Sequence, residues 1–107
     1  MKNKKEITEY ISVDFSLFES RNTFHLIMKM IIGSDVYTGN SLDSLHDALT
    51  SICKKTVFVI TNEEAGRANF GGYFDSIMRV FRDSAEENEM ISFVTDDTGE
   101  EKDDTKS

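Results

Sequence analysis

Proline and tryptophan are absent from the chain, and among its 107 residues there is one cysteine, Cys53. A single cysteine cannot form an internal disulfide, which fits a reducing compartment such as the cytosol. Because Cys53 follows the apolar residue Ile52, we expect it to be a small core side chain rather than a reactive thiol. Without proline, the turns are expected to depend on glycine, asparagine and aspartate.

Long apolar runs are also missing. No stretch of 18 apolar residues occurs, so no membrane-spanning helix is predicted. Residues 1–8 begin with several lysines and lack the apolar segment of a secretion signal, so we expect a flexible leader and a cytoplasmic protein.

The charge of the chain is strongly negative. Twenty acidic residues against 12 basic ones give a net charge of −8 and an isoelectric point near 4.6. Residues 96–107 contain six acidic residues and two lysines, and this composition predicts a disordered acidic tail after a single domain over 9–95. A negative field disfavours nucleic acid and speeds the encounter with basic proteins.

The pattern of apolar residues alternates between strand and helix. Asn22 or Thr23 can cap the first helix, which should end at Gly33, and the continuous apolar run at 56–60 is typical of a strand buried on both faces. Strands separated by helices predict a small α/β domain, a three-stranded parallel sheet flanked by helices. The strands are expected at 10–14, 56–60 and 91–94, and the helical segments at 22–32, 42–50, 63–69 and 73–85.

The segment 42–50 predicts a short helix with two different sides. Leu42, Leu45 and Leu49 fall on one stripe at helical spacing, while Asp43 and Asp47 share another. Two like charges one turn apart repel each other by roughly 0.2–0.5 kcal/mol, so helix stability does not require this pair. Lysine and arginine are absent between Lys29 and Lys54, so a binding partner could supply the opposite charge.

The run from Tyr37 through Gly39 and Leu42-Asp43 to Asp47 resembles the inhibitory loop and helix of the barstar family, intracellular inhibitors of the secreted ribonuclease barnase. The later segment Val80-Phe81-Arg82-Asp83 strengthens the resemblance, which covers residues 9–95. It implies a barstar-like fold.

The resemblance also implies a set of contact residues, carried over position by position. The inhibitory carboxylates fall on Asp43 and Asp47, and a later helix adds Asp83 and Glu87. The remaining expected contacts, in and around the same loop and helix, are Tyr37, Thr38, Gly39, Ser41, His46, Thr50 and Ser51. His46, Ile52 and Lys54 depart from the family pattern, which bears on the identity of the partner.

The function that the resemblance implies is an inhibitor, or immunity protein, that occludes the active site of a cognate toxin in a 1:1 complex. The toxin is expected to be a ribonuclease with a basic active site, as in a toxin–antitoxin pair. This interpretation includes no catalytic residue, no metal, no cofactor, no nucleic acid and no membrane.

Several alternatives remain open from the residues themselves. Asp43, His46 and Asp47 could hold a divalent metal from one helical turn, or the same fold could bind another basic protein without inhibiting it. The acidic residues could be a solvated helix face, and His25 could be a helix-surface or satisfied core residue. Catalysis by Cys53 and His46 lacks an orienting acid and an oxyanion donor.

Overall fold

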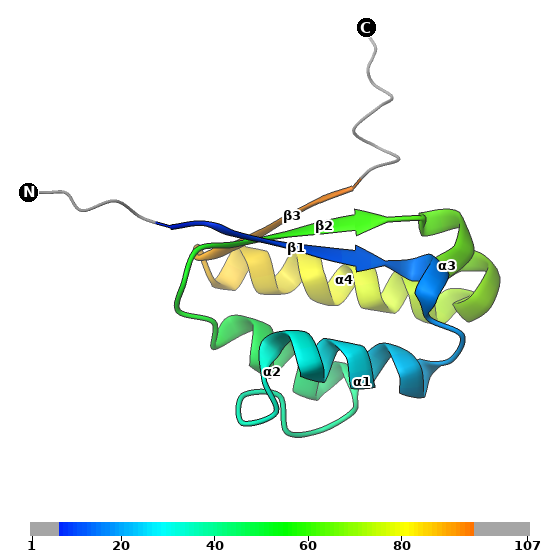
Figure 1. The fold of residues 1–107 in the computed structure, drawn as a ribbon, viewed down its shortest axis with the longest axis horizontal. Coiled ribbons are helices and arrows are strands. Elements are labelled where there is room, and N and C mark those ends of the chain that lie inside the picture. The colour runs from blue at the N-terminus through cyan, green and yellow to red at the C-terminus, as the bar shows by residue number, and fades with distance from the viewer. Residues whose placement is uncertain (1–6, 96–107) are drawn as a thin grey trace, which may run out of the picture.

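Three parallel strands form a single sheet in the computed structural model, which describes residues 7–95 (Figure 1). Within this part of the chain, the strands alternate with a short 3-10 helix, η1, and four α-helices. The leader residues 1–6 and the predicted tail, 96–107, lie outside the described residues. In chain order the elements are β1 (Glu9–Asp14), η1 (Phe15–Leu17), α1 (Arg21–Ile32), α2 (Leu42–Thr50), β2 (Thr56–Thr61), α3 (Glu63–Phe70), α4 (Gly72–Glu87) and β3 (Ile91–Thr95).

Strand β2 lies at the centre of the sheet, in the order β1-β2-β3. Phe58 aligns with Ile11 of β1 and with Phe93 of β3. Each pair of neighbouring parallel strands requires a long crossover, and the helical segments provide it. The expected α/β class with a three-stranded parallel sheet is therefore confirmed.

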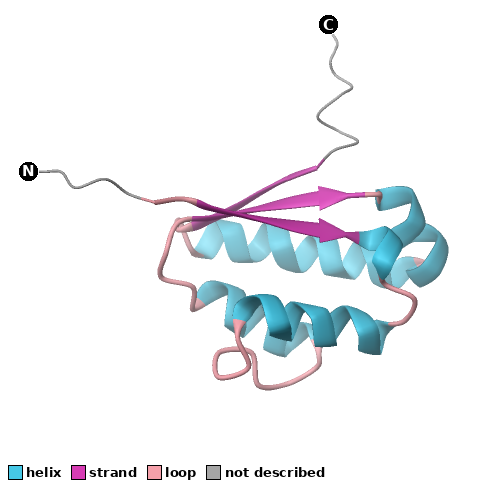
Figure 2. Ribbon diagram, viewed as in Figure 1, coloured by secondary structure: helices cyan, strands magenta, loops and turns pink. Residues whose placement is uncertain are grey.

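Helices α1, α2 and α4 lie on the same side of the sheet, and α3 lies at the end of the sheet where β1 and β2 finish (Figure 2). The face of β2 that meets them is fully buried at Phe58 and Ile60, whereas Val57 and Val59 on the other face are half-buried. On that open face the neighbouring strands expose 71% of Tyr10 and 51% of Val94. The prediction that β2 is buried on both faces is thus wrong, since an apolar run does not reveal whether a second layer covers the sheet.

Helix α1 is capped two or three residues earlier than expected. Ser20 is the N-cap, and its hydroxyl accepts a hydrogen bond of 3.2 Å from the backbone N–H of Thr23. Several residues in this stretch can cap a helix, so the choice of Asn22 or Thr23 was wrong by two or three positions. The expected end at Gly33 is confirmed, and this residue has a φ of +115°, a conformation that favours glycine.

Cys53 is exposed, in contrast to the core position expected from Ile52 beside it. It lies in the connection between α2 and β2, where the chain runs over the surface. None of the helices in residues 7–95 has the length and apolar composition needed to cross a membrane.

Candidate functional site

Helix α2 presents its two carboxylates to solvent, as its sequence predicts. Leu45 and Leu49 are fully buried, while Asp43 and Asp47 are exposed on the opposite side. The helix begins at the N-cap Ser41, whose hydroxyl accepts a hydrogen bond of 3.1 Å from the backbone N–H of Ser44. The apolar stripe therefore anchors the helix and leaves the acidic stripe accessible.

Neither carboxylate of α2 has an ion-pair partner among residues 7–95. Asp43 lies in the first turn, where the helix dipole favours a negative charge, but Asp47 lies a turn later and gains little from it. Arg21 and Asp43 line the same hollow, of about 520 Å³, without forming an ion pair. The two carboxylates thus leave their charge available to a partner.

Tyr37 lies beneath the loop that precedes α2, in the core of the protein and not on its surface. Its side chain has 0% exposure, so the expected contact between Tyr37 and a partner does not fit this conformation. The Tyr37 hydroxyl donates a hydrogen bond of 3.3 Å to the backbone carbonyl of Ser41, the residue that caps α2. Burial raises the pKa of Tyr37 to about 12, which keeps this hydroxyl protonated as a donor.

His25 continues this contact into a chain of hydrogen bonds. Because the proton of Tyr37 is directed to a carbonyl, the imidazole Nδ1–H of His25 must donate to the Tyr37 oxygen. Its Nε2 is then an acceptor for the hydroxyl of Tyr73 on α4, at 2.7 Å. The interpretation of His25 as a satisfied core residue is confirmed, and burial, together with the charge of Lys29, lowers its pKa.

Close packing also fixes the loop at Gly39. A Cβ built on Gly39 would overlap the Oγ of Ser44 and lie 2.8 Å from its Cβ, so only glycine fits against the first turn of α2. Thr38 and Ser41 on either side of it are exposed. These expected contact residues therefore lie next to the acidic stripe.

His46 connects α2 to the end of α4. Its Nε2 lies 3.2 Å from a carboxylate oxygen of Glu87, and Asp83, one turn earlier on α4, is exposed. The structure thus brings the two acidic helices side by side, with His46 between them. We define the acidic face as the exposed surface formed by Asp43, His46, Asp47, Asp83 and Glu87.

The end of α2 is fixed by hydroxyls and by an amide. Thr50 and Ser51 both donate hydrogen bonds to the backbone carbonyl of Asp47, at 3.1 and 2.8 Å. From the end of α4, the Asn88 side chain donates to the carbonyls of Leu49 and Ile52, at 3.0 and 2.9 Å. Thr50 and Ser51 therefore have a structural role at the margin of the acidic face.

Three positioning residues were missed by the sequence interpretation: Tyr73, Asn88 and, in its specific role, His25. Each contacts a residue 12 to 48 positions away. A local pattern carries no signal for such pairs, and only the packing of α1 and α4 around α2 reveals them.

The alternative of a metal site on α2 finds no support. Within residues 7–95, no three histidine, cysteine or acidic side chains come together in a way that could hold a metal ion, and this includes Asp43, His46 and Asp47. His46 is directed to Glu87 instead.

A parallel α/β domain with a helix-borne acidic surface is the class of protein that this fold and site define. The family model described as Barstar (barnase inhibitor) matches residues 8–98, and the chain therefore belongs to the barstar family. Members of this family are inhibitors of ribonucleases rather than enzymes. A search of curated proteins found no match to the chain.

Proposed function

We propose that this chain is an immunity protein that inhibits a cognate ribonuclease toxin by occluding its active site in a 1:1 complex. The observation that carries the proposal is the pair of exposed carboxylates, Asp43 and Asp47, without an ion-pair partner in the described part of the chain. Family membership gives the partner class, a ribonuclease.

The mechanism follows from the chemistry of RNA cleavage. A ribonuclease stabilises the charge of a phosphate with cationic side chains, and carboxylates form short, charge-assisted hydrogen bonds with such groups. A carboxylate on a convex helix can occupy the phosphate position and cannot be cleaved. Asp47 is assigned the deepest insertion, and Asp43 pairs with a flanking arginine or lysine of the toxin.

The surrounding residues define the rim of this contact. Thr38, Gly39 and Ser41 place the loop against the toxin, while Asp83 and Glu87 extend the negative surface from α4. Tyr37 acts from beneath, through Ser41, and does not touch the toxin. Since an immunity protein protects the cell that makes the toxin, it acts in the cytoplasm before secretion.

The net charge of −8 supports fast association. Complementary charge raises the rate of encounter between proteins, and salt screens the effect. The same charge disfavours RNA itself as the ligand.

An RNA-cleavage assay tests the proposal. The tagged chain is purified from its native host together with its bound ribonuclease, which is then separated and titrated with fresh inhibitor. Wild type is expected to abolish cleavage at one equivalent, and Glu64→Gln, a change of an exposed carboxylate on α3, should do the same. The double variant Asp43→Asn/Asp47→Asn should leave cleavage largely intact. Full inhibition by the double variant, or capture of a partner without nuclease activity, would contradict the proposal.

A further inference from the structure

A furrow runs along α1, between this helix and the loop 33–41, which returns along α1 before α2 begins (Figure 1). The furrow consists of three hollows of about 520, 300 and 280 Å³. The first and second hollows share Asn22 and Asn40 in their lining, and the second and third share Leu26 and Lys29. We call this continuous surface the α1 furrow.

The far end of the α1 furrow is apolar and exposed. Leu26 and Met30 lie one turn apart on α1 and expose 60% and 76% of their surface, and Val36 in the following loop exposes 42%. The outward side of a helix that packs on a core is normally polar. Acidic residues are absent from α1, although the chain contains 20 of them. This side of the helix is therefore suited to contact with an apolar surface.

The middle of the furrow can form hydrogen bonds with a polypeptide backbone. Asn22 on α1 and Asn40 in the loop line it from its two sides, and both are exposed. A side-chain amide donates and accepts hydrogen bonds, as does each peptide unit of an extended chain. Between Arg21 and Met30 the helix is roughly 14 Å long, about the length of four extended residues. The furrow thus has the size for a short extended segment.

The charges along the furrow cancel. Arg21 and Lys29 line it from α1, Asp43 lines its near end, and Asp35 lies beside Gly33 at its far end. A long-range field therefore contributes little to binding at this surface. Affinity here must come from close apolar contact and from hydrogen bonds.

The near end of the furrow joins the acidic face. Asp43 lines the first hollow together with Arg21 and Ser41, so a protein bound to Asp43 also covers the mouth of the furrow. A specific interface involves roughly 20–30 residues on each side, more than the acidic face and its loop provide. The centre of such an interface is also more apolar than its rim, whereas every residue of the acidic face is polar. The α1 furrow supplies the apolar area that the acidic face lacks.

We propose that the α1 furrow binds an extended segment of the ribonuclease that lies beside its active site. An apolar side chain of this segment packs on Leu26 and Met30, and its backbone forms hydrogen bonds with Asn22 and Asn40. The proposal rests on the proposed inhibitory function, because the same ribonuclease must occupy Asp43. The acidic face then sets the association rate and its salt dependence, while the furrow sets the dissociation rate.

Binding kinetics with the purified ribonuclease separate the two surfaces. Leu26→Gln/Met30→Gln should raise the dissociation rate constant more than about tenfold, because both apolar contacts are lost. The association rate constant and its salt dependence should stay the same, since no charge is altered. The control Ile7→Gln/Leu17→Gln changes side chains that are 79% and 61% exposed outside the furrow, and it should bind like wild type. Both double variants should unfold at the same urea concentration as wild type, which separates a lost contact from a lost fold.

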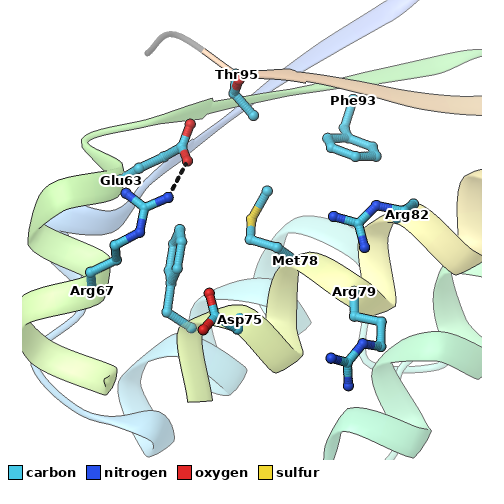
Figure 3. Close-up of a pocket in the computed structure, with 9 residues that line it drawn as sticks. Glu63, Arg67, Asp75, Met78, Arg79, Arg82, Phe93 and Thr95 are labelled. Atoms are coloured by element: carbon cyan, nitrogen blue, oxygen red, sulfur yellow. Dashed lines mark hydrogen bonds and ion pairs between the residues drawn. The ribbon is translucent and has the colours of Figure 1, made fainter. Parts of the chain in front are cut away.

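Methyl signals of methionine locate the contact directly. In a complex of the isotope-labelled chain with unlabelled ribonuclease, the Met30 methyl group should show nuclear Overhauser effects to apolar protons of the ribonuclease. The Met78 methyl group, in the hollow between α4 and β3, should show none (Figure 3).

The possible failures are distinguishable. Equal dissociation rates in the two double variants, or intermolecular contacts at Met78 and not at Met30, would overturn this proposal and leave the inhibitory function intact. A wild-type chain that binds no ribonuclease would instead overturn both proposals. A dimer of the free chain that Leu26→Gln/Met30→Gln dissociates would overturn this proposal in favour of a second copy as the occupant.

Discussion

The two flanks of α4 differ in charge and in what holds them. Toward α2, the helix carries Asp83 and Glu87 and contributes to the acidic face. Toward β3, Arg82 lines the arginine groove, a hollow of about 460 Å³ that Arg67, Arg79 and Phe93 also line. Arg79 lies one helical turn from Asp83 and therefore stands between the two flanks. Figure 1 shows α2 and β3 on opposite sides of this one helix. The net charge of −8 conceals this division, because residues one position apart, such as Arg82 and Asp83, point to different flanks.

The acidic face is fixed by buried and satisfied groups, whereas the arginines of the groove are not. Tyr37 and His25 support the start of α2, and Asn88 closes its end. Arg79 and Arg82 have no ion-pair partner within residues 7–95. Fixed carboxylates suit a single, specific partner, because little conformational freedom is lost when that partner binds.

Removal of the apolar anchor of α2 should have the largest effect on stability. Leu45 has 0% exposure, so Leu45→Ala should lower the free energy of unfolding by roughly 2–5 kcal/mol through the cavity it leaves. Urea unfolding measures the loss. The same substitution at Leu26, which is 60% exposed on α1, should cost far less, and equal losses would show that α2 is not anchored by this stripe.

Loss of the Tyr37 hydroxyl should have the next largest effect. Tyr37→Phe leaves the buried Nδ1–H of His25 without its acceptor, at an expected cost of about 1–3 kcal/mol in the free energy of unfolding. Urea unfolding also measures this change, with Tyr10→Phe as the control because Tyr10 is 71% exposed. No difference between the two variants would contradict the supporting role of Tyr37.

Acidification should lower the free energy of unfolding through His25, which supports the start of α2. The folded protein lowers the pKa of His25 below its usual value of 6.5, so the unfolded chain binds the proton first. Stability is therefore complete above about pH 6.5 and is lost as the pH falls below it, by at most about 1.4 kcal/mol per pH unit from this group.

Thermal or urea unfolding between pH 7 and pH 5 measures this dependence, and His25→Gln is the control that should flatten it. The titratable groups around His25 are Lys29 on its own helix, Tyr37 in the loop, and Tyr73 on α4. Arg21, 4.0 Å from the ring of Tyr73, and Asp43 line the same hollow as His25. Asp14 contributes little in this range: hydrogen bonds from Ser16 and Asn62 lower its pKa, so the stability that this carboxylate supplies is lost mainly below about pH 5. If the free energy of unfolding of His25→Gln fell with pH as steeply as that of wild type, a group other than His25 would be responsible for the pH dependence.

Neutralisation of the groove should have the smallest effect on folding. Arg79 and Arg82 are exposed, so Arg79→Gln/Arg82→Gln should change the free energy of unfolding by less than about 0.5 kcal/mol. Affinity for the ribonuclease should also be unchanged within about twofold in the single variant Arg82→Gln, since Arg82, unlike Arg79, does not lie one helical turn from Asp83. Loss of inhibition in this variant would place the binding surface on both flanks.

The strands, helices and acidic pair could be predicted because each depends on a local period. Leu45, Leu49, Asp43 and Asp47 lie where a period of 3.6 residues puts them. The inward position of Tyr37 could not be predicted, because its partner His25 lies 12 residues away on another helix.

Burial was the least predictable property. Cys53 follows an apolar residue but lies in an exposed connection, and Val57 and Val59 belong to an apolar run but face the uncovered side of the sheet. Both outcomes depend on which surfaces the helices cover. The arginine groove was missed for a similar reason, since it combines α3, α4 and β3.

Calorimetric titration of the purified ribonuclease with Asp47→Ala tests the central claim most directly. Truncation of a carboxylate that neutralises desolvated cations should cost more than about 2 kcal/mol, so the dissociation constant should rise more than about 30-fold, with one site per molecule. Glu64→Ala should bind like wild type. Equal and small changes in the two variants would show that Asp47 does not enter the active site, and would contradict the account.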